Sequence, residues 1–431
     1  MKSYISRKRI SLCFLMFFSS LLLVHPALSA DAVSEDRGLT LGKCIAIALE
    51  NHPDLAVGMG TVDSLSARIT QAAASGRTQG SLSPSYSYSK ADGGSEQGQY
   101  STSLTLNQSV YDWGKRDLKI GQARLNRDAS LADVERARDS VVRSVAAAYY
   151  QFNRSERSVK IAKERLVNYE TRLKWAKDFY AVGSKPKIEV SAAELDLANA
   201  RLSLVSALAQ GRTSVAQLAS SMGVPEIVSV DLSDRLAFQK HTVVLDEALE
   251  RAMQNRPDLK SELLRVEGVK QALALAQKGM TPDLNASAGY SLAGKTDPTE
   301  KKDWRLQMGI SIPLWDGGMT KAQATQARAD LAVSEAKFEG LRQGVILSVR
   351  ESYVALSEAQ EGVAVALEAQ RYAKERLDLA MGRFRAGVGN SLEVSDAIES
   401  FANSQNSVVQ SLYDSKIAQL NLEYAIGGMV Q

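Results

Sequence analysis

The sequence predicts a mainly α-helical fold with a smaller β portion that crosses a membrane, and three observations support this prediction. One unit is written twice, at an offset of 204 residues. Each copy holds two stretches in which apolar and polar residues alternate, as in a strand with one buried face. Each copy also holds a long run without proline, whose apolar residues recur on steps of three and four, as in a coiled coil.

The duplication sets the domain organisation that we predict. Leu41–Leu55 (LGKCIAIALENHPDL) matches Leu245–Leu259 (LDEALERAMQNRPDL), and the likeness continues at the same offset to near the end of the chain. Self-similarity of this kind indicates one structural unit used twice. We expect a first structural repeat over residues 31–223, a linker over residues 224–242 and a second structural repeat over residues 243–431.

The start of the chain has the composition of an export signal. Four basic residues precede an apolar stretch, residues 10–24, and the small residues at 27–30 fit a cleavage site. A retained membrane anchor is the alternative, but the apolar stretch is short for one. We therefore expect a signal peptide over residues 1–30, a mature chain that starts near Asp31, and export past the inner membrane.

Charge and cysteine content argue against two classes of protein. Removal of the signal lowers Lys+Arg from 52 to 48 against 49 acidic residues, so the net charge becomes about −1 and nucleic-acid binding gains no support. The mature chain keeps one cysteine, Cys44, which cannot form an internal disulfide. Because its neighbours are Ile45, Ala46 and Ile47, we expect Cys44 to be a small residue of the core.

Two helices are expected at the start of each repeat. The short ones are predicted over residues 41–51 and 245–255. Pro53 and Pro257 stand where a second helix would begin, a position at which proline is tolerated because its missing N–H is not needed. We expect the second helices to continue to about Ser75 and Gly279.

A strand pair follows in each repeat, over residues 81–109 and 283–313. The alternation lasts for roughly ten residues per strand, the length that crosses a bilayer in a barrel. Four strands cannot close a barrel, and unpaired sheet edges are not tolerated in lipid, so several chains must share one. The expected apolar face consists of Leu82, Pro84, Tyr86, Tyr88, Tyr100, Thr102, Leu104, Leu106, Leu284, Ala286, Ala288, Tyr290, Leu292, Trp304, Leu306, Met308, Ile310 and Ile312.

A long helix and a returning helix complete each repeat. The first long helix, residues 115–180, would measure roughly 100 Å at 1.5 Å per residue, about three times the thickness of a bilayer's hydrocarbon core. Its expected seam runs from Leu131 to Tyr180. Turns that contain glycine, at 181–186 and 386–390, end the two long helices. The returning helices, predicted over about 188–222 and 392–426, can pack antiparallel on them.

Short motifs stand at corresponding places in the two repeats. Asn-x-Pro-Asp-Leu lies near each start, Tyr-Asp-Trp-Gly or Trp-Asp-Gly-Gly follows each strand pair, and Phe-x-x-Val-Gly or Phe-x-Ala-Gly lies at each turn. Their order over residues 39–427 resembles the TolC-like outer-membrane efflux protein family. The resemblance implies a homotrimer in the outer membrane of a Gram-negative bacterium, in which a twelve-stranded β-barrel shared by three protomers continues into a trimeric α-barrel tunnel across the periplasm.

The resemblance also implies a function and a set of partners. Such a protein is a passive exit duct of a tripartite efflux pump or a type I secretion system, with no catalytic residue, cofactor or metal. Its partners would be outer-membrane lipid, a periplasmic adaptor (membrane fusion protein) and an inner-membrane transporter of the RND, ABC or MFS class. The adaptor would dock on the two turns, at Val182, Gly183, Gly387, Val388 and Gly389. The alternative is that these are ordinary helix-hairpin turns that use glycine for its positive φ. The two interpretations are compatible with each other.

Acidic residues just beyond the turns are candidates for a constriction. By the resemblance they are Glu189, Glu393 and Asp396, and symmetry would make each of them a ring of carboxylates that attracts cations. For Glu189 a favourable interaction with the helix dipole is an equal alternative. Glu393 and Asp396 share a helix face at i and i+3, which favours the constriction for that pair.

One departure from the family puts its closing lock in doubt. Some members hold the closed tip with a basic residue and a tyrosine hydroxyl near the second turn, where this chain has Gly389 and Phe384. Gating would then depend on packing, or on Arg383 or Arg385.

Aromatic residues gather in and beside the predicted strands. The functional interpretation is that these residues form aromatic girdles at the membrane interfaces, and the alternative is that they fill the core. Three of the chain's four Trp belong to this group, which favours the girdles. The group consists of Tyr86, Tyr88, Tyr100, Tyr111, Trp113, Tyr290, Trp304 and Trp315.

Two other classes of function fit the sequence less well than the exit duct. A periplasmic coiled-coil adaptor or scaffold would explain the heptads but not four amphipathic strands with aromatic ends. An enzyme is disfavoured because the chain has no GxSxG, HExxH, P-loop or GxGxxG motif. The two histidines of the mature chain match no metal-site spacing.

Overall fold

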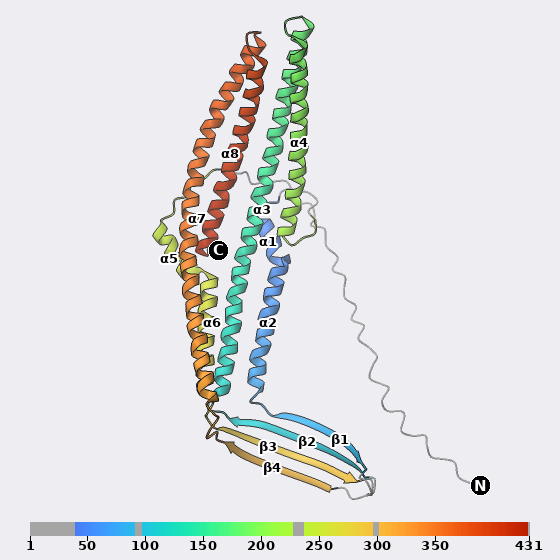
Figure 1. Ribbon diagram of the computed structural model, residues 1–431, viewed down its shortest axis with the longest axis vertical. Helices are drawn as coiled ribbons and strands as arrows, with labels where there is room; N and C mark the ends of the chain where they lie inside the picture. Colours follow the sequence, from blue (N-terminus) through green and yellow to red (C-terminus); the bar gives the residue numbers. More distant parts are fainter. Residues whose placement is uncertain (1–38, 91–96, 227–236, 296–300, 430–431) are drawn as a thin grey trace, which may run out of the picture. The chain divides into compact units, whose positions relative to one another are not determined.

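The computed structural model describes residues 39–90, 97–226, 237–295 and 301–429. The expected signal peptide, the expected start of the mature chain and the middle of the linker lie outside these ranges. Figure 1 shows the same order of elements in both halves. The first half contains α1 (Leu41–Asn51), α2 (Pro53–Ala74), β1 (Gln79–Ser89), β2 (Gln97–Tyr111), α3 (Lys115–Ala181) and α4 (Lys187–Ser221). The second half contains α5 (Leu245–Asn255), α6 (Pro257–Gln277), β3 (Asp283–Lys295), β4 (Lys301–Ser311), α7 (Met319–Arg385) and α8 (Ser391–Ile426).

The long helices α3 and α7 each contain 67 residues, which corresponds to about 100 Å. Each is followed by its returning helix, so α3 packs against α4 and α7 packs against α8. The helix α3 also contacts α2, α6 and α8, so it joins the helical parts of the two repeats, while β2 and β3 join their strands. Two positions predicted for its seam, Leu131 and Tyr180, are exposed. Tyr180 lies in the last turn of α3, just before the turn that leads to α4 at Lys187.

Two hydrophobic clusters in the helical part are copies of each other. The first contains Val141, Val145 and Leu218, and the second contains their counterparts Val345, Val349 and Leu422. Cys44 belongs to the first cluster and is fully buried, as predicted. The duplicated sequence therefore builds the same core twice.

The motif that follows each strand pair begins a long helix. The carboxylate of Asp112 accepts hydrogen bonds from the backbone N–H groups of Gly114 (3.1 Å) and Arg116 (2.8 Å). Asp316 does the same in the second repeat for Gly318 (2.9 Å) and Thr320 (2.7 Å). These bonds satisfy donors that have no partner within a first helical turn.

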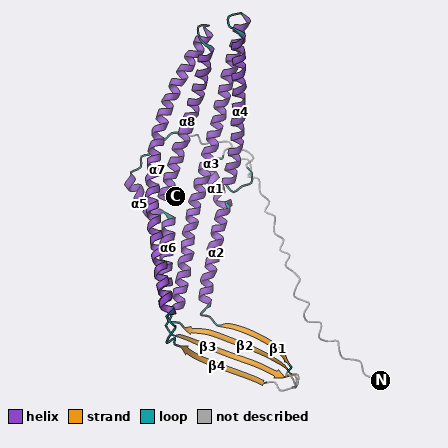
Figure 2. Cartoon of the chain, viewed as in Figure 1, coloured by secondary structure: helices purple, strands orange, loops and turns teal. Residues whose placement is uncertain are grey.

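The four strands form one antiparallel sheet in the order β1-β2-β3-β4 (Figure 2). The register confirms the expected apolar face, because its members are paired directly across the sheet. One such row is Leu82, Leu104, Tyr290 and Trp304. The next row is polar and consists of Ser83, Ser103, Ser291 and Asp303. Directly paired residues lie on the same face of a sheet, so each row belongs to one face.

The strands differ from the prediction at their ends. The first pair spans residues 79–111 instead of 81–109, and a bulge separates Ser109 from Tyr111. The strand β4 ends at Ser311, so Ile312 lies just beyond it. The alternation of apolar and polar residues identifies the middle of a strand but does not determine the residues at which the strand begins and ends.

Among the described residues, no helix combines enough length with enough hydrophobicity to cross a membrane.

Candidate functional site

The sheet has one apolar and one polar face. The polar face carries Ser, Thr, Asn and Gln from all four strands, and at its helix-proximal end Asn107, Ser287 and Gln307 occupy one row. A pocket of about 440 Å³ lies at this end and is lined mostly by polar residues, among them Arg77 and Asn285. A sheet of this kind can place lipid on one side and water on the other.

Four of the predicted aromatic residues form two groups, one toward each end of the strands. Near the strand pairs' loops, Tyr86 pairs directly with Tyr100, and the Tyr100 ring covers Gly294 on the next strand. At the opposite ends of the strands, the rings of Tyr111 and Trp113 meet edge to face with centroids 4.7 Å apart. The remaining predicted members are Tyr88 in β1, Tyr290 in β3, Trp304 in β4 and Trp315 after β4.

The predicted docking residues lie at the ends of the two helical hairpins. Val182 and Val388 are exposed, and Gly183 and Gly387 have φ angles of 72° and 80° with no neighbour within 4 Å of an added Cβ. Gly389 differs from these four because it is buried, and a Cβ at this position would lie 2.6 Å from the Phe384 backbone nitrogen. The structure therefore places Gly389 against the end of α7.

This packing leaves no room for a side chain at the position of Gly389. A basic side chain at position 389 would collide with the α7 backbone. Phe384 is buried against Phe179, with ring centroids 5.5 Å apart, and has no hydroxyl group to offer. Of the two arginines named as alternatives, Arg383 lies 3.8 Å from Glu393, and Arg385 stacks over the ring of Trp175.

The three constriction candidates differ in exposure. Asp396 is exposed, whereas Glu189 and Glu393 are partly buried. Glu393 and Asp396 are close on α8, while Glu189 is in the first turn of α4, on the other hairpin. Their roles remain predictions.

A polar layer that sequence reasoning missed lies next to these acids. Buried Arg172 on α3 forms an ion pair with Asp196 on α4 and donates a 2.8 Å hydrogen bond to Ser391 on α8. One turn away, the Tyr169 hydroxyl donates to Glu399 over 2.9 Å, and Arg165 pairs with the same carboxylate. Burial, together with this carboxylate, raises the pKa of Tyr169 to about 12. The layer connects the first hairpin to α8.

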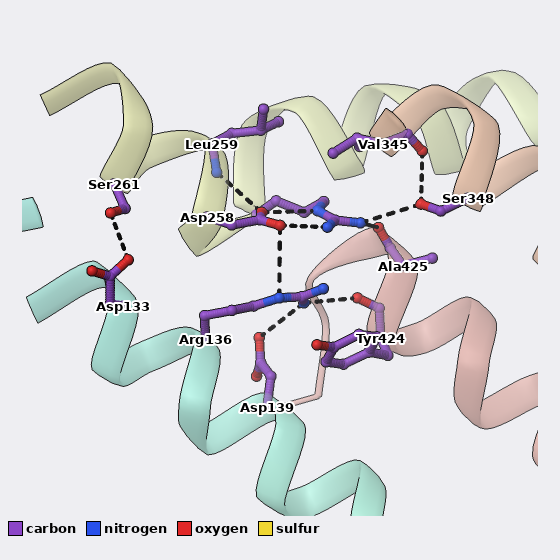
Figure 3. Close-up of polar contacts among 11 residues, drawn as sticks. Asp133, Arg136, Asp139, Asp258, Leu259, Ser261, Val345, Ser348, Tyr424 and Ala425 are labelled. Carbon is purple, nitrogen blue, oxygen red and sulfur yellow. Dashed lines mark hydrogen bonds and ion pairs between the residues drawn. The ribbon is translucent and has the colours of Figure 1, made fainter. Parts of the chain in front are cut away.

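A second polar cluster joins the two repeats farther along α3 (Figure 3). The Asp258 carboxylate, at the start of α6, lies between two arginines, with distances of 2.5 Å to Arg256 Nη2 and 3.7 Å to Arg136 Nε. Arg136 donates to the Tyr424 carbonyl (3.2 Å) and stacks over its ring, 3.6 Å from the centroid. We call Arg136, Asp139, Arg256, Asp258 and Tyr424 the joint cluster.

Burial shifts the pKa values within the joint cluster. Burial alone favours a higher pKa for Asp258, but the hydrogen bonds and charge of Arg256 and the charge of Arg136 outweigh it and lower that pKa. Burial raises the pKa of Asp139 although Arg136 opposes this, and burial together with Arg256 lowers the pKa of Arg136. The joint cluster thus stabilises the charged form of Asp258 and destabilises the charged form of Asp139.

Asp139 and Asp258 should therefore change stability with pH in opposite directions. A lowered folded pKa contributes stability above the unfolded value of 3.8, and this contribution is lost as the pH falls through the folded pKa. A group whose pKa is raised in the folded protein contributes stability below the unfolded value of 3.8. This contribution is lost as the pH rises through the folded pKa. At neutral pH we expect Asp258→Asn to lower the thermal unfolding midpoint and Asp139→Asn to raise it. As the pH falls, the Asp139→Asn difference should disappear between the raised pKa of Asp139 and about pH 3.8, whereas the Asp258→Asn difference should shrink only below about pH 3.8. Circular dichroism of the detergent-purified variants measures this, and parallel pH profiles would contradict it.

The comparisons with known proteins agree with this geometry. The family model described as "Outer membrane efflux protein" matches residues 44–224 and again residues 248–428. The chain is 23% identical over 435 residues to the probable efflux pump outer membrane protein TtgC of Pseudomonas putida, with 94% of this chain and 87% of TtgC covered. It is 23% identical over 401 residues to the outer membrane protein TolC of Escherichia coli, with 88% and 80% covered.

Solved structures show the same fold. The outer membrane protein VceC of Vibrio cholerae superposes with a TM-score of 0.76 at 21% identity, over 90% of this chain and 96% of VceC. A structure of CusC gives a TM-score of 0.77 at 18% identity, over 92% and 96% of the two chains. The family model matches both halves of the chain and together these matches cover most of its residues. The chain therefore belongs to the outer membrane efflux protein family.

Proposed function

We propose that this protein is the outer-membrane exit duct of a tripartite efflux pump or a type I secretion system. The observation that carries the proposal is the sheet with one apolar and one polar face, on the same chain as two 67-residue helices. Lipid would cover the apolar face and the conducted solute would pass along the polar one. The helices are long enough to extend the conduit far beyond a membrane. The duct itself would perform no chemical reaction.

The proposed duct is a homotrimer. In the described chain β1 and β4 each pair on one side only, and such edges need partners in lipid. Three chains with four strands each would form the twelve-stranded barrel that the family resemblance implies. The repeats 31–223 and 243–431 would alternate around the tunnel wall, with the segment 224–242 linking them on each chain.

The proposed contacts with other proteins lie at the hairpin ends. Each turn offers an open surface that suits the tip of a periplasmic adaptor, and its backbone has a positive φ that favours glycine. The residues concerned are Val182, Gly183, Gly387 and Val388. An RND, ABC or MFS transporter in the inner membrane would supply the solute and the energy. Glu393 and Asp396 would narrow the tunnel just beyond the turns, and the two aromatic groups would sit at the two membrane interfaces.

Bulky substitutions at the turns test the proposal. We expect Gly183→Trp and Gly387→Trp to abolish export, because a large side chain at the turn blocks docking and strains a positive φ. The barrel should still assemble. Growth of a deletion strain that carries each variant is measured against a panel of dyes, detergents and antibiotics, and assembly is measured as heat-modifiable oligomer in the outer-membrane fraction.

Gly317→Trp is the matched control. Gly317 also has a positive φ (63°) and no neighbour within 4 Å, but it precedes α7 at the end opposite the turn. The control should keep both export and assembly. Wild-type resistance in the two turn variants would remove the docking assignment, and a mature chain that is monomeric without detergent would remove the duct itself.

A further inference from the structure

The charged residues of the sheet's polar face are unevenly distributed. The strands β1 and β2 contain no charged residue. At the helix-proximal end Asp283 shares a row with Ser311, and its carboxylate lies 3.0 Å from the ammonium group of Lys115. The other charged residues of this face belong to β3 and β4 and lie between the middle of the sheet and its loop end. They are Lys295, Lys301, Asp303 and Arg305, which we call the cationic patch.

Strand register brings the four side chains of the cationic patch together. Lys301 pairs directly with Ala293, two residues before Lys295, so Lys295 and Lys301 are diagonal neighbours with Cα atoms about 7–8 Å apart. Asp303 and Arg305 follow Lys301 on the same face in steps of about 7 Å, because every second residue of a strand points to the same side. The cationic patch therefore covers one continuous area of the polar face.

The cationic patch carries a net positive charge. Its three cations stand against one carboxylate, that of Asp303, which lies 3.9 Å from a guanidinium nitrogen of Arg305. The side chains of Arg305 and Asp303 are 76% and 67% exposed. Lys295 and Lys301 are also exposed, and among the described residues no carboxylate lies within ion-pair distance of either lysine. Two positive charges per chain thus remain uncompensated within the patch and act on the adjoining solvent.

We propose that the cationic patch is an anion-attracting site that favours small anionic solutes in the barrel end of the duct. This proposal rests on the proposed function, in which the polar face surrounds the conducted solute. Lipid behind the sheet has a low dielectric constant, so the field of the patch is directed into the lumen. Three patches, one from each chain, would act on the same section of the lumen. The Ser, Thr, Asn and Gln side chains around them carry no charge that would oppose this field.

The cationic patch has the opposite sign to the constriction candidates near the helical turns. Glu189, Glu393 and Asp396 would attract cations, whereas the patch would attract anions. The carboxylates of the two connecting loops, residues 91–96 and 296–300, lie outside the described ranges. Because the selectivity of the whole duct combines all of these charges, the contribution of the patch is measured as a difference between variants that change only its own charges.

Ion selectivity in planar lipid bilayers tests the proposal. The mature protein is purified from outer membranes, and the K⁺/Cl⁻ permeability ratio is obtained from the reversal potential in a KCl gradient. We expect Lys301→Gln/Arg305→Gln to raise this ratio about twofold or more near 0.1 M salt, where the Debye length is about 10 Å. Asp303→Asn should lower the ratio. Both shifts should fade near 1 M salt, where the Debye length is about 3 Å.

Lys302→Gln is the matched control. Lys302 follows Lys301 directly on β4, but it pairs with Leu292, which belongs to an apolar row on the other face of the sheet. The substitution therefore removes the same charge, one residue away, from the side that lipid would cover. The permeability ratio of this variant should stay at the wild-type value.

The outcomes separate this proposal from the proposed function. A conducting channel whose permeability ratio is unchanged in Lys301→Gln/Arg305→Gln would leave the exit duct intact and overturn the role of the patch. A shift of equal size in Lys302→Gln would overturn it as well. So would a shift that persists near 1 M salt, because salt screens an effect of charge but not a change in the shape of the channel. An oligomer that forms no conducting channel would refute the exit duct and, with it, the anion-attracting site.

Discussion

Asp258→Asn is expected to lower the free energy of unfolding by about 3 kcal/mol at neutral pH. The substitution keeps the shape of the side chain and removes the negative charge between Arg136 and Arg256, which expose only 17% and 8% of their side chains. Breaking a buried ion pair from one side costs about 3–5 kcal/mol, because the remaining charge stays buried without a partner. We expect the lower end because about a fifth of the Asp258 side chain is exposed. Thermal or chemical unfolding of the detergent-purified protein measures the loss.

The internal repeat supplies the control for this experiment. Asp54 occupies the corresponding position in the first repeat, in the same Asn-x-Pro-Asp motif, but its side chain is 76% exposed and lies 3.8 Å from the Nδ1 atom of His52, with no arginine in the place of Arg256. Asp54→Asn should therefore change the free energy of unfolding by less than about 1 kcal/mol. Equal losses from the two substitutions would show that the motif acts through the local turn and not through the joint cluster.

The positions of the helices could be predicted because the chain marks their ends. Proline occupies the first turns of α2 and α6, and glycine follows or precedes the long helices, so each periodic stretch has a visible start and stop. For the sheet, the sequence predicts which residues share a face, because a register shift of one residue would turn every apolar side chain to the polar face.

Contacts between distant elements could not be predicted in the same way. Arg136 interrupts no pattern on α3, and nothing in its neighbourhood points to Asp258, which lies 122 residues away. The same holds for Arg172 and Ser391, and for the burial of Gly389 beneath the end of α7. Periodicity identifies the face that a residue occupies, whereas the partner on that face depends on how whole helices pack.

The Asn-x-Pro-Asp turn meets the end of the returning helix in each repeat, and glycine is required where they touch. Gly223 follows α4 with a φ of 72°, and a Cβ there would lie 2.9 Å from the Asn51 carbonyl oxygen. Gly427 follows α8 with a φ of 75°, and its added Cβ would lie 3.1 Å from the Arg256 Cα atom. The obstacle in both cases is backbone, which cannot rotate away.

Gly223→Ala should accordingly lower the free energy of unfolding by about 2–5 kcal/mol. The left-handed conformation costs a residue with a Cβ about 1–2 kcal/mol, and forcing a methyl group into a packed contact costs about 1–3 kcal/mol more. Gly387→Ala separates the two terms, because its φ is 80° but no atom lies within 4 Å of the added Cβ. It should lose only the first term, measured by the same unfolding experiment. Equal losses at positions 223 and 387 would mean that backbone conformation alone, and not the contact with the turn, requires glycine at the end of the returning helix.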